Sequence, residues 1–246
     1  NNIMNKIIVN NNIINSNFDL KINNNKIYID KDTTIIYLNS NCSYEIYLSN
    51  NINIFEYYKN SYSNNIYNIL ENSNIVFNRF SFNCSLITNI NLDYPYTSLE
   101  YKYSCINIDD NTYIININHN SKNTNSKVIN HGLNITSSKL DFLINGIINK
   151  ESSNVICNQD SKIILKKDNN SSIKPNLLVN NYDTISNHSC YIGHFKEEEM
   201  FYLNSRGLSK KTSEELLSKA FLLSNMDINF LNRNMILEDL KLIGGE

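Results

Sequence analysis

The sequence predicts a mainly β fold, in which a parallel β-helix core is followed by C-terminal α-helices. Three observations predict it. Apolar and polar residues alternate up to about residue 190, clusters of Asn, Asp and Ser interrupt this alternation, and the apolar period becomes helical after residue 195. A period of two is typical of half-buried strands, and a period near 3.6 is typical of amphipathic helices.

The first part of the chain predicts many short strands joined by turns. Phe18, Leu20 and Ile22 alternate with polar neighbours, and the same pattern recurs at intervals. Segments rich in Asn and Asp, such as 23–25 and 109–111, separate these stretches. Asn and Asp tolerate the left-handed conformation and hydrogen-bond their own backbone, so we expect turns there.

Such a series of strands can form a sandwich, a barrel or a β-solenoid. A sandwich favours Gly-rich hairpins, and the chain has only six glycines. Short strands with polar Asn at the corners favour a parallel β-helix, although no strict sequence repeat is visible.

The C-terminal part predicts helices. Segment 196–205 carries acidic residues in its first turn, which complement a helix N-terminus, and Gly207 is suited to end this helix. Ser209 or Thr212 can cap the next helix, and a last helix is expected over about 227–242.

A boundary at residue 195 divides the chain into a β-helix core, 1–195, and a C-terminal helical region, 196–246. The length of 246 residues suits one large domain with an appendage. A solenoid needs a cap, because its last turn otherwise exposes edge strands, and we expect the helices to provide it.

Composition argues against several function classes. The net charge of −2 gives no electrostatic case for nucleic acid or an anionic membrane, and no apolar run approaches the roughly 20 residues that span a bilayer. Asn makes up about a fifth of the chain, which we attribute to A/T-rich coding and not to function. The odd, widely spaced cysteines argue against a disulfide framework and indicate reduced intracellular thiols. They are Cys42, Cys84, Cys105, Cys157 and Cys190.

The sequence contains no motif of a known catalytic constellation. A Gly-rich phosphate loop, GxSxG and HExxH are all missing. Asp109 and Asp110 are expected at a solvated corner, and Glu197–Glu199 at a helix start. We therefore predict that the chain is not an enzyme.

His188 and Cys190 are the residue types most suited to a metal. If residues 185–192 form a strand, both side chains point to one face. An imidazole and a thiolate suit a soft or borderline metal such as iron or zinc, although two ligands do not complete a site. Cys157 could approach from a neighbouring turn, whereas His194 lies at the strand-to-helix junction.

A series of short motifs follows His188 in a recognisable order. These are Gly193, Glu197–Glu199, Phe201-Tyr202-Leu203, Arg206-Gly207 and Ala220-Phe221. The segment resembles the C-terminal signature of the SufB/SufD family, the scaffold subunits of the SUF iron–sulfur cluster assembly machinery. Residues 117–149, with His119, Ser126, Gly132 and Asn145-Gly146, and residues 158–188 extend the similarity upstream.

The details resemble SufD more than SufB. Lys174-Pro175, Asp183 and His188 form a SufD-like arrangement. SufB-like chains usually carry a cysteine where Gln159 stands and Glu where Ser189 stands.

The resemblance implies a right-handed β-helix that pairs with a SufB-like β-helix subunit. It also implies a SufC-like ATPase docked on residues 196–224, with no nucleotide bound by this chain. His188 takes the place of the SufD histidine near the site of cluster assembly, and Cys190 stands where the family has a small residue. The transient iron–sulfur cluster would be assembled with the partner. Longer family members imply further sequence before residue 1.

We therefore expect a non-catalytic SufD-like scaffold subunit. The coding bias and the family together suggest a plastid-like organelle, and a cytoplasmic system fits equally. One alternative is a SufB-like scaffold, with Cys157 or Cys190 as the thiolate. Others are a β-helix carbohydrate-active enzyme and a structural solenoid.

Overall fold

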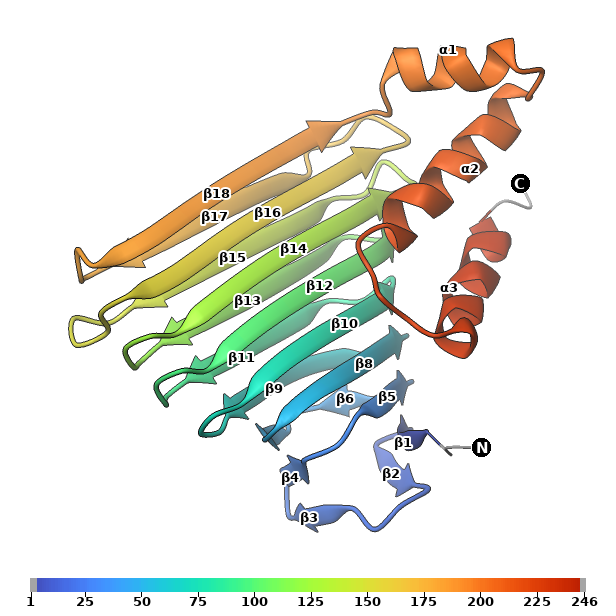
Figure 1. The fold of residues 1–246 in the computed structure, drawn as a ribbon. Coiled ribbons are helices and arrows are strands. Elements are labelled where there is room, and N and C mark those ends of the chain that lie inside the picture. The colour runs from blue at the N-terminus through green and yellow to red at the C-terminus, as the bar shows by residue number, and fades with distance from the viewer. Residues whose placement is uncertain (1–3, 244–246) are drawn as a thin grey trace.

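The computed structural model describes residues 4–243. It is a parallel β-solenoid of about seven turns followed by three helices, which confirms the predicted fold class (Figure 1). The elements are β1 (Asn5–Asn10), β2 (Ile13–Ser16), β3 (Lys21–Asn23), β4 (Lys26–Ile29), β5 (Thr33–Leu38), β6 (Asn41–Cys42), β7 (Glu45–Leu48), β8 (Asn51–Lys59), β9 (Tyr62–Ile69), β10 (Asn74–Phe82), β11 (Leu86–Leu92), β12 (Ser98–Asn107), β13 (Asn111–His119), β14 (Asn125–Asn134), β15 (Leu140–Ile148), β16 (Val155–Leu165), β17 (Ser172–Val179), β18 (Thr184–Gly193), α1 (Glu197–Ser205), α2 (Lys210–Leu223) and α3 (Phe230–Ile243).

Two sheets form the walls of the solenoid. The first, sheet A, has the order β18-β16-β14-β12-β10-β8-β5-β1-β2, and the second, sheet B, has the order β17-β15-β13-β11-β9-β7-β4-β3. Successive turns pair in parallel, and the antiparallel pairs among the described residues are β1–β2 and β3–β4. Each turn therefore adds one strand to each sheet.

Asparagine shapes the turns between strands, both at the corners between the two sheets and in the two hairpins of the first turn. Ten Asn residues have positive φ, and within the described chain the other non-glycine residue with positive φ is Tyr96. Asn reaches the left-handed region more easily than other residues with a side chain. The ten are Asn11, Asn12, Asn24, Asn39, Asn50, Asn60, Asn72, Asn83, Asn123 and Asn154. This confirms the predicted Asn-rich turns and explains how the chain turns with so few glycines.

Asparagine also forms a ladder on the outer face of sheet B. The Nδ2 atoms of Asn116, Asn145 and Asn176 each donate to the Oδ1 of the Asn one turn before, at 2.7, 2.7 and 2.8 Å. Asn116 and Asn145 also accept from the Asn one turn later, so these bonds help to fix the parallel register.

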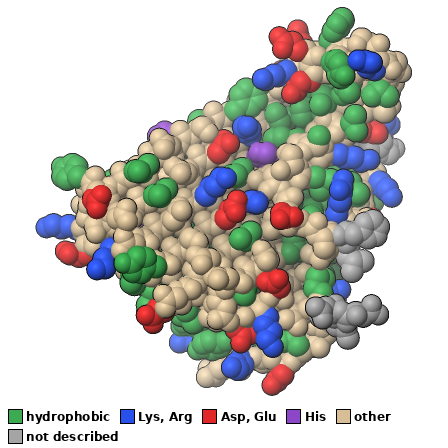
Figure 2. Space-filling model, viewed as in Figure 1, with side chains coloured by type: hydrophobic (Ala, Val, Ile, Leu, Met, Phe, Trp, Pro, Cys, Tyr) green, Lys and Arg blue, Asp and Glu red, His purple; other side chains and the backbone are tan. Residues whose placement is uncertain are grey.

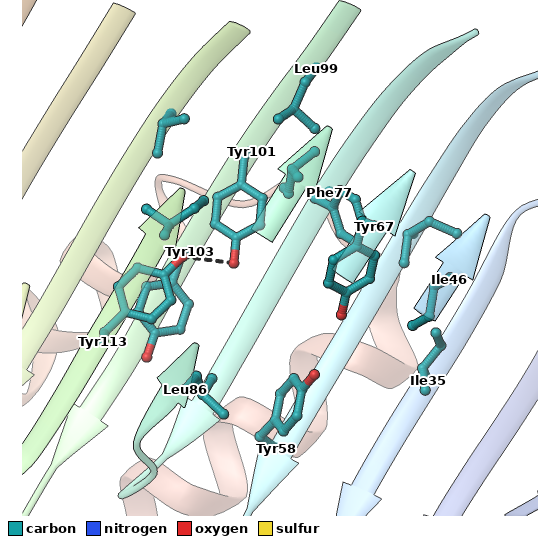
Figure 3. Close-up of a cluster of buried hydrophobic side chains, with 14 of the residues drawn as sticks. Ile35, Ile46, Tyr58, Tyr67, Phe77, Leu86, Leu99, Tyr101, Tyr103 and Tyr113 are labelled. Carbon is teal, nitrogen blue, oxygen red and sulfur yellow. Dashed lines mark hydrogen bonds between the residues drawn. The ribbon is translucent and has the colours of Figure 1, made fainter. Parts of the chain in front are cut away.

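The inward-facing residues of both sheets form one continuous core. Figure 3 shows its aromatic part, in which Phe77, Tyr101 and Tyr113 come from three different strands. The Tyr113 hydroxyl donates to the Tyr101 hydroxyl at 2.7 Å. Buried tyrosines need such partners, because an unpaired buried hydroxyl destabilises the fold.

A buried ion pair lies inside the middle turns. Arg79 and Glu56 are both fully buried, and the Arg79 Nε donates to Glu56 Oε2 at 2.7 Å. The other Arg79 nitrogens donate to Thr88 Oγ1 at 2.5 Å and to the Tyr67 hydroxyl at 2.9 Å. The guanidinium thus has a partner for each of its nitrogens, as a buried charge requires.

The end of α1 and the start of α2 follow the predicted signals, and the last helix, α3, begins at Phe230, close to the expected start at about 227. The backbone N–H groups of Gly207 and Leu208 bond the last carbonyls of α1, and Gly207 has φ of +89°. Ser209 caps α2, because its side chain accepts from the Thr212 backbone N–H at 3.1 Å. Thr212 therefore lies inside the first turn of α2 and is not its cap.

Helices α2 and α3 cover the outer face of sheet A and not the end of the solenoid, as Figure 1 shows. Outward-facing Phe80, Ile106 and Leu133 form an apolar cluster with Leu222 and Ile236. The expected end cap was therefore wrong, because this apolar stripe on the sheet binds the helices. Within the described residues, no helix is long and apolar enough to cross a membrane.

The two ends of the solenoid differ. At the first turn, the short strands β2 and β3 fold back antiparallel over β1 and β4. At the last turn, β17 and β18 are the terminal strands of their sheets, and among the described residues nothing pairs with their outer edges. The last turn therefore leaves 8- and 10-residue strand edges open.

Candidate functional site

His188 and Cys190 lie on β18, the last strand of sheet A, and both are exposed. In the register of β16 and β18, His188 is opposite Gln159 and Cys190 is opposite Ser161. Gln159 and Ser161 are buried and occupy inward-facing positions, so His188 and Cys190 continue the inward face into the open turn. The strand thus brings the two predicted residues to one face at the open end.

Cys157 lies one layer deeper. It is on β16, opposite Ser186 of β18, and only 1% of its surface is exposed. Its thiol belongs to a small apolar cluster with Ile148 and Val155. The structure therefore places Cys157 beneath the open turn, and not on the exposed surface with His188.

His131 and His194 have structural partners. The His131 Nδ1 lies 2.8 Å from the Phe221 carbonyl oxygen, and its ring stacks on the Phe221 ring beneath α2. The His194 Nδ1 lies 2.7 Å from the Leu165 carbonyl oxygen, and its Nε2 lies 3.0 Å from Asp168 Oδ1. These contacts fix the helix to the sheet and orient the junction between β18 and α1.

The acidic residues that the sequence singled out lie at a corner of the solenoid and at the start of a helix. Asp109 and Asp110 are exposed at a corner, where Asp109 accepts from Asn83 Nδ2 and Asp110 accepts from the Lys139 backbone N–H, both at 2.7 Å. Glu197–Glu199 form the first turn of α1. These carboxylates serve turns and a helix start, as the sequence predicted.

The donor side chains do not form a complete metal site. Among residues 4–243, no group of three or more His, Cys, Asp or Glu side chains is placed to hold a metal ion. His188 and Cys190 would therefore need ligands from outside the described chain to complete the usual four-ligand shell of iron or zinc.

A groove of about 550 Å³ lies between α1, α2 and the end of sheet A. Phe195 and Met200 line it together with polar ends from Lys210 and Glu214. Phe201 of α1 also lines the groove and is 75% exposed. Tyr202, the next residue on α1, is 58% exposed, so two neighbouring aromatic side chains of this helix face solvent.

Charged side chains on the face shown in Figure 2 are of both signs and intermixed. No single-sign patch dominates that face, which agrees with the low net charge of −2. Long-range attraction of a highly charged polymer is therefore not a property of this face.

One comparison decides the family. The family model described as SUF system FeS cluster assembly, SufBD core domain, matches residues 61–221. The chain belongs to the SufB/SufD family. The match runs from near the start of β9 into α2 and includes Cys157, His188 and Cys190. This family membership supports a role in iron–sulfur cluster assembly by the SUF system. A search of the curated proteins finds no match to the chain.

Sequence reasoning did not predict two buried polar groups in the last turns. The Gln159 Oε1 is buried without a hydrogen-bond partner among the described residues. His119 is fully buried beside Ser126, and Ser126 lies opposite Cys157 in the register of β14 and β16. Residues 126 and 157 are 31 positions apart in sequence, so only the register of adjacent turns could have revealed that they lie side by side.

Proposed function

We propose that this chain is a non-catalytic, SufD-like scaffold subunit of the SUF complex. It pairs with a SufB-like β-helix subunit at its open last turn, and it docks a SufC-like ATPase through residues 196–224. The iron–sulfur cluster is the cargo that the assembled complex builds. The observation that carries the proposal is the open last turn with exposed His188, in a chain of this family.

The open edges support a β-sheet partner. Unpaired strand edges are templates for another strand, and proteins usually shorten, cover or charge them. Here β18 is ten residues long, and Leu178 and Ile185 on the last turn are 57% and 63% exposed. A second β-helix that adds its own strands would satisfy the edge and bury these side chains.

Two positions favour a SufD-like over a SufB-like chain. Gln159 replaces the expected SufB-type cysteine, and an amide cannot supply a thiolate. Ser189 replaces the expected Glu, and its hydroxyl donates to Asp160 Oδ1 at 2.7 Å. If the chain instead acts as the SufB-like scaffold, clusters will form on it alone.

His188 is the cluster ligand that we propose from this chain. A neutral imidazole can ligate iron, and protonation removes the lone pair that it needs. His188 is exposed and the described donors form no complete site, so a partner would supply the remaining ligands. Cys190, two residues further on the same face, is a candidate second ligand.

Reconstitution of the full complex tests the role of His188. We expect His188→Ala to leave complex assembly intact and to reduce cluster formation at least tenfold, measured by the absorbance of the bound cluster. Asn187→Ala is the matched control, because Asn187 is an exposed neighbour whose Nδ2 bonds Asn158 on the outer face. Equal cluster yields from the wild type and His188→Ala would remove His188 from the mechanism.

The ATPase contact is tested separately. The chain contains no phosphate-binding loop, so ATP hydrolysis would come from the partner. We expect Phe201→Asp to abolish co-purification of the SufC-like ATPase, because it places a charge on the apolar side of α1. Leu242→Asp is the control, since Leu242 is 64% exposed on α3 and lies outside the proposed segment. Retention of the ATPase by Phe201→Asp would contradict this assignment.

A further inference from the structure

A polar groove lies on the outer face of sheet A, at the first turns of the solenoid. Its volume is about 800 Å³, within the range of small-molecule sites. Strands β5, β8 and β10 form its floor, the corners before β5 and β8 form one wall, and the linker between α2 and α3 forms the other. The linker is held in place because the Asp227 backbone N–H donates to Asn78 Oδ1 at 3.0 Å. The groove is therefore separate from the open last turn.

One buried amide in the groove has a donor without a partner. Asn78 lines the groove and is 3% exposed, and its Oδ1 accepts from the Asp227 N–H. That bond fixes the orientation of the amide, because only the oxygen can accept. The Asn78 Nδ2 is left without a hydrogen-bond partner among the described residues. A buried donor without a partner is costly, so an acceptor in the groove would stabilise this arrangement.

A second buried amide offers an acceptor. Asn232, in the first turn of α3, lines the groove and is 4% exposed. Its Nδ2 donates to Thr34 Oγ1 at 3.3 Å, and the Thr34 hydroxyl donates to the Met4 sulfur at 3.4 Å. Because Thr34 has only one proton to donate, Asn232 must turn its nitrogen towards Thr34. The Asn232 Oδ1 then accepts from no residue of the described chain and is available to a ligand.

An apolar floor separates the free donor from the free acceptor. Thr34 and Asn78 are both opposite Phe55, on the neighbouring strands to either side of it. Neighbouring strands are about 4.8 Å apart, so these two polar positions are about 10 Å apart. Phe55 lines the groove between them and is 5% exposed. A ligand that reaches both amides therefore needs polar groups at both ends and an apolar face between them.

The charges of the groove argue against an ionic ligand. The described lining residues carry three carboxylates and one ammonium group, from Asp30, Asp32, Asp227 and Lys31. An anion such as phosphate would meet a net negative surface. A cation would offer no acceptor to the Asn78 Nδ2, and within the described chain no three metal-ligating side chains are grouped to hold a metal ion. A neutral ligand with donors and acceptors fits better, and a hydroxyl group supplies both from one atom.

We propose that this groove binds a neutral polyhydroxylated ligand of about the length of a disaccharide. One ligand hydroxyl accepts from Asn78 Nδ2, another donates to Asn232 Oδ1, and the apolar C–H face of a sugar ring lies on Phe55. The exposed carboxylate of Asp227, beside Asn78, accepts from a further hydroxyl. Apart from Asn78, the described lining residues lie outside the family match at 61–221, so this site does not rest on the scaffold role.

The side-chain amide resonances of the isolated folded chain, followed by NMR, test the proposal. Cellobiose and maltose are the polyol probes, and spermidine, inorganic phosphate and N-acetyl-trialanine amide are the comparison probes. We expect at least one disaccharide to shift the Asn78 and Asn232 side-chain resonances in a saturable way, and the comparison probes to leave them unchanged. If neither disaccharide shifts these two residues, the proposal is overturned, whichever comparison probe binds.

Two variants separate ligand contact from the position of the linker. Asn78→Leu should weaken disaccharide binding about tenfold, because a buried hydrogen bond to the ligand is lost. Asn225→Leu is the matched control, since Asn225 holds the same linker to the Tyr103 and Ile129 carbonyl oxygens but does not line the groove. Equal weakening by both variants would overturn the assigned role of Asn78. The readout needs neither partner nor cluster, so its failure would leave the proposed scaffold function untouched.

Discussion

Arg79 in the middle of the solenoid and His188 in its last turn both lie on the inward face of sheet A, two residues apart in the strand register, but their surroundings differ completely. Arg79 is fully buried, and each of its nitrogens has a partner. His188 is exposed on a strand whose outer edge is unpaired in the described chain. The same strand pattern therefore yields a closed, self-sufficient interior in the middle and an incomplete surface at the end. We therefore expect the stability of the chain to depend mainly on the middle turns, and the proposed pairing with a partner to depend on the last turn.

The largest effect should come from breaking the closed interior. Arg79→Met leaves the Glu56 carboxylate buried without its partner, so we expect a loss of about 3–5 kcal/mol in the free energy of unfolding. Urea denaturation measures it. Arg206→Met is the matched control, because Arg206 is exposed and should change stability by less than about 0.5 kcal/mol. Equal stability of the two variants would show that the buried pair does not stabilise the middle turns.

Acid should weaken the interior through His119. Its pKa is about 4 in the folded chain, against about 6.5 in the unfolded chain, because burial disfavours the charged ring. The unfolded chain therefore binds a proton between these values that the folded chain does not. Stability is unaffected above pH 6.5 and falls by up to about 3 kcal/mol as the pH drops to 4.

His119→Gln provides the control for this pH dependence. We expect the variant to be less stable at pH 7, because Ser126 and Thr124 lose a partner, but to lose less stability between pH 6.5 and 4. Burial also lowers the pKa of His131, so part of the acid sensitivity should remain in the variant. Parallel pH curves for the wild type and the variant would contradict the assignment to His119.

A substitution in the open last turn should leave the stability of the chain nearly unchanged and should weaken binding to a partner. Ile185→Lys places a charge on the exposed last turn, and we expect less than about 0.5 kcal/mol of change in the stability of the isolated chain. Binding to a SufB-like partner should weaken at least tenfold, measured by analytical ultracentrifugation. Ile13→Lys is the control, because Ile13 is 64% exposed on the closed end and Ile185 is 63% exposed on the open end. Equal weakening by both variants would mean that the open edge is not the pairing surface.

Sequence reasoning predicted the closed part of this comparison better than the open part. The period of two and the Asn-rich corners predicted the solenoid, because both follow from local chemistry. The register could not be predicted, because the length of a turn varies. Thr33 is opposite Ile54, 21 residues later, whereas Ser126 is opposite Cys157, 31 residues later.

The candidate site was predicted only in part for the same reason. His188 and Cys190 are on one strand, so their spacing was enough to put them on one face. The pairing of Ser126 with Cys157 joins two turns, and it could be found only from the register. The prediction that the helices cap the end of the solenoid was wrong. The alternation of apolar and polar residues does not show that sheet A also carries an apolar stripe on its outer face, and this stripe binds the helices.

The smallest expected effect concerns one corner of the closed part. Tyr96 has φ of +61°, whereas every other non-glycine residue with positive φ in the described chain is Asn. Its backbone N–H donates to the carbonyl of Asn123 in the next turn, so the conformation is held by the solenoid and not by the residue. We expect Tyr96→Asn to stabilise the fold by about 1 kcal/mol, since Asn adopts this conformation at lower cost, and Asn123→Tyr to destabilise it by a similar amount. Thermal unfolding of both variants measures the pair. A loss of stability in Tyr96→Asn would mean that the tyrosine ring, which is 67% exposed, contributes more than its backbone strain costs.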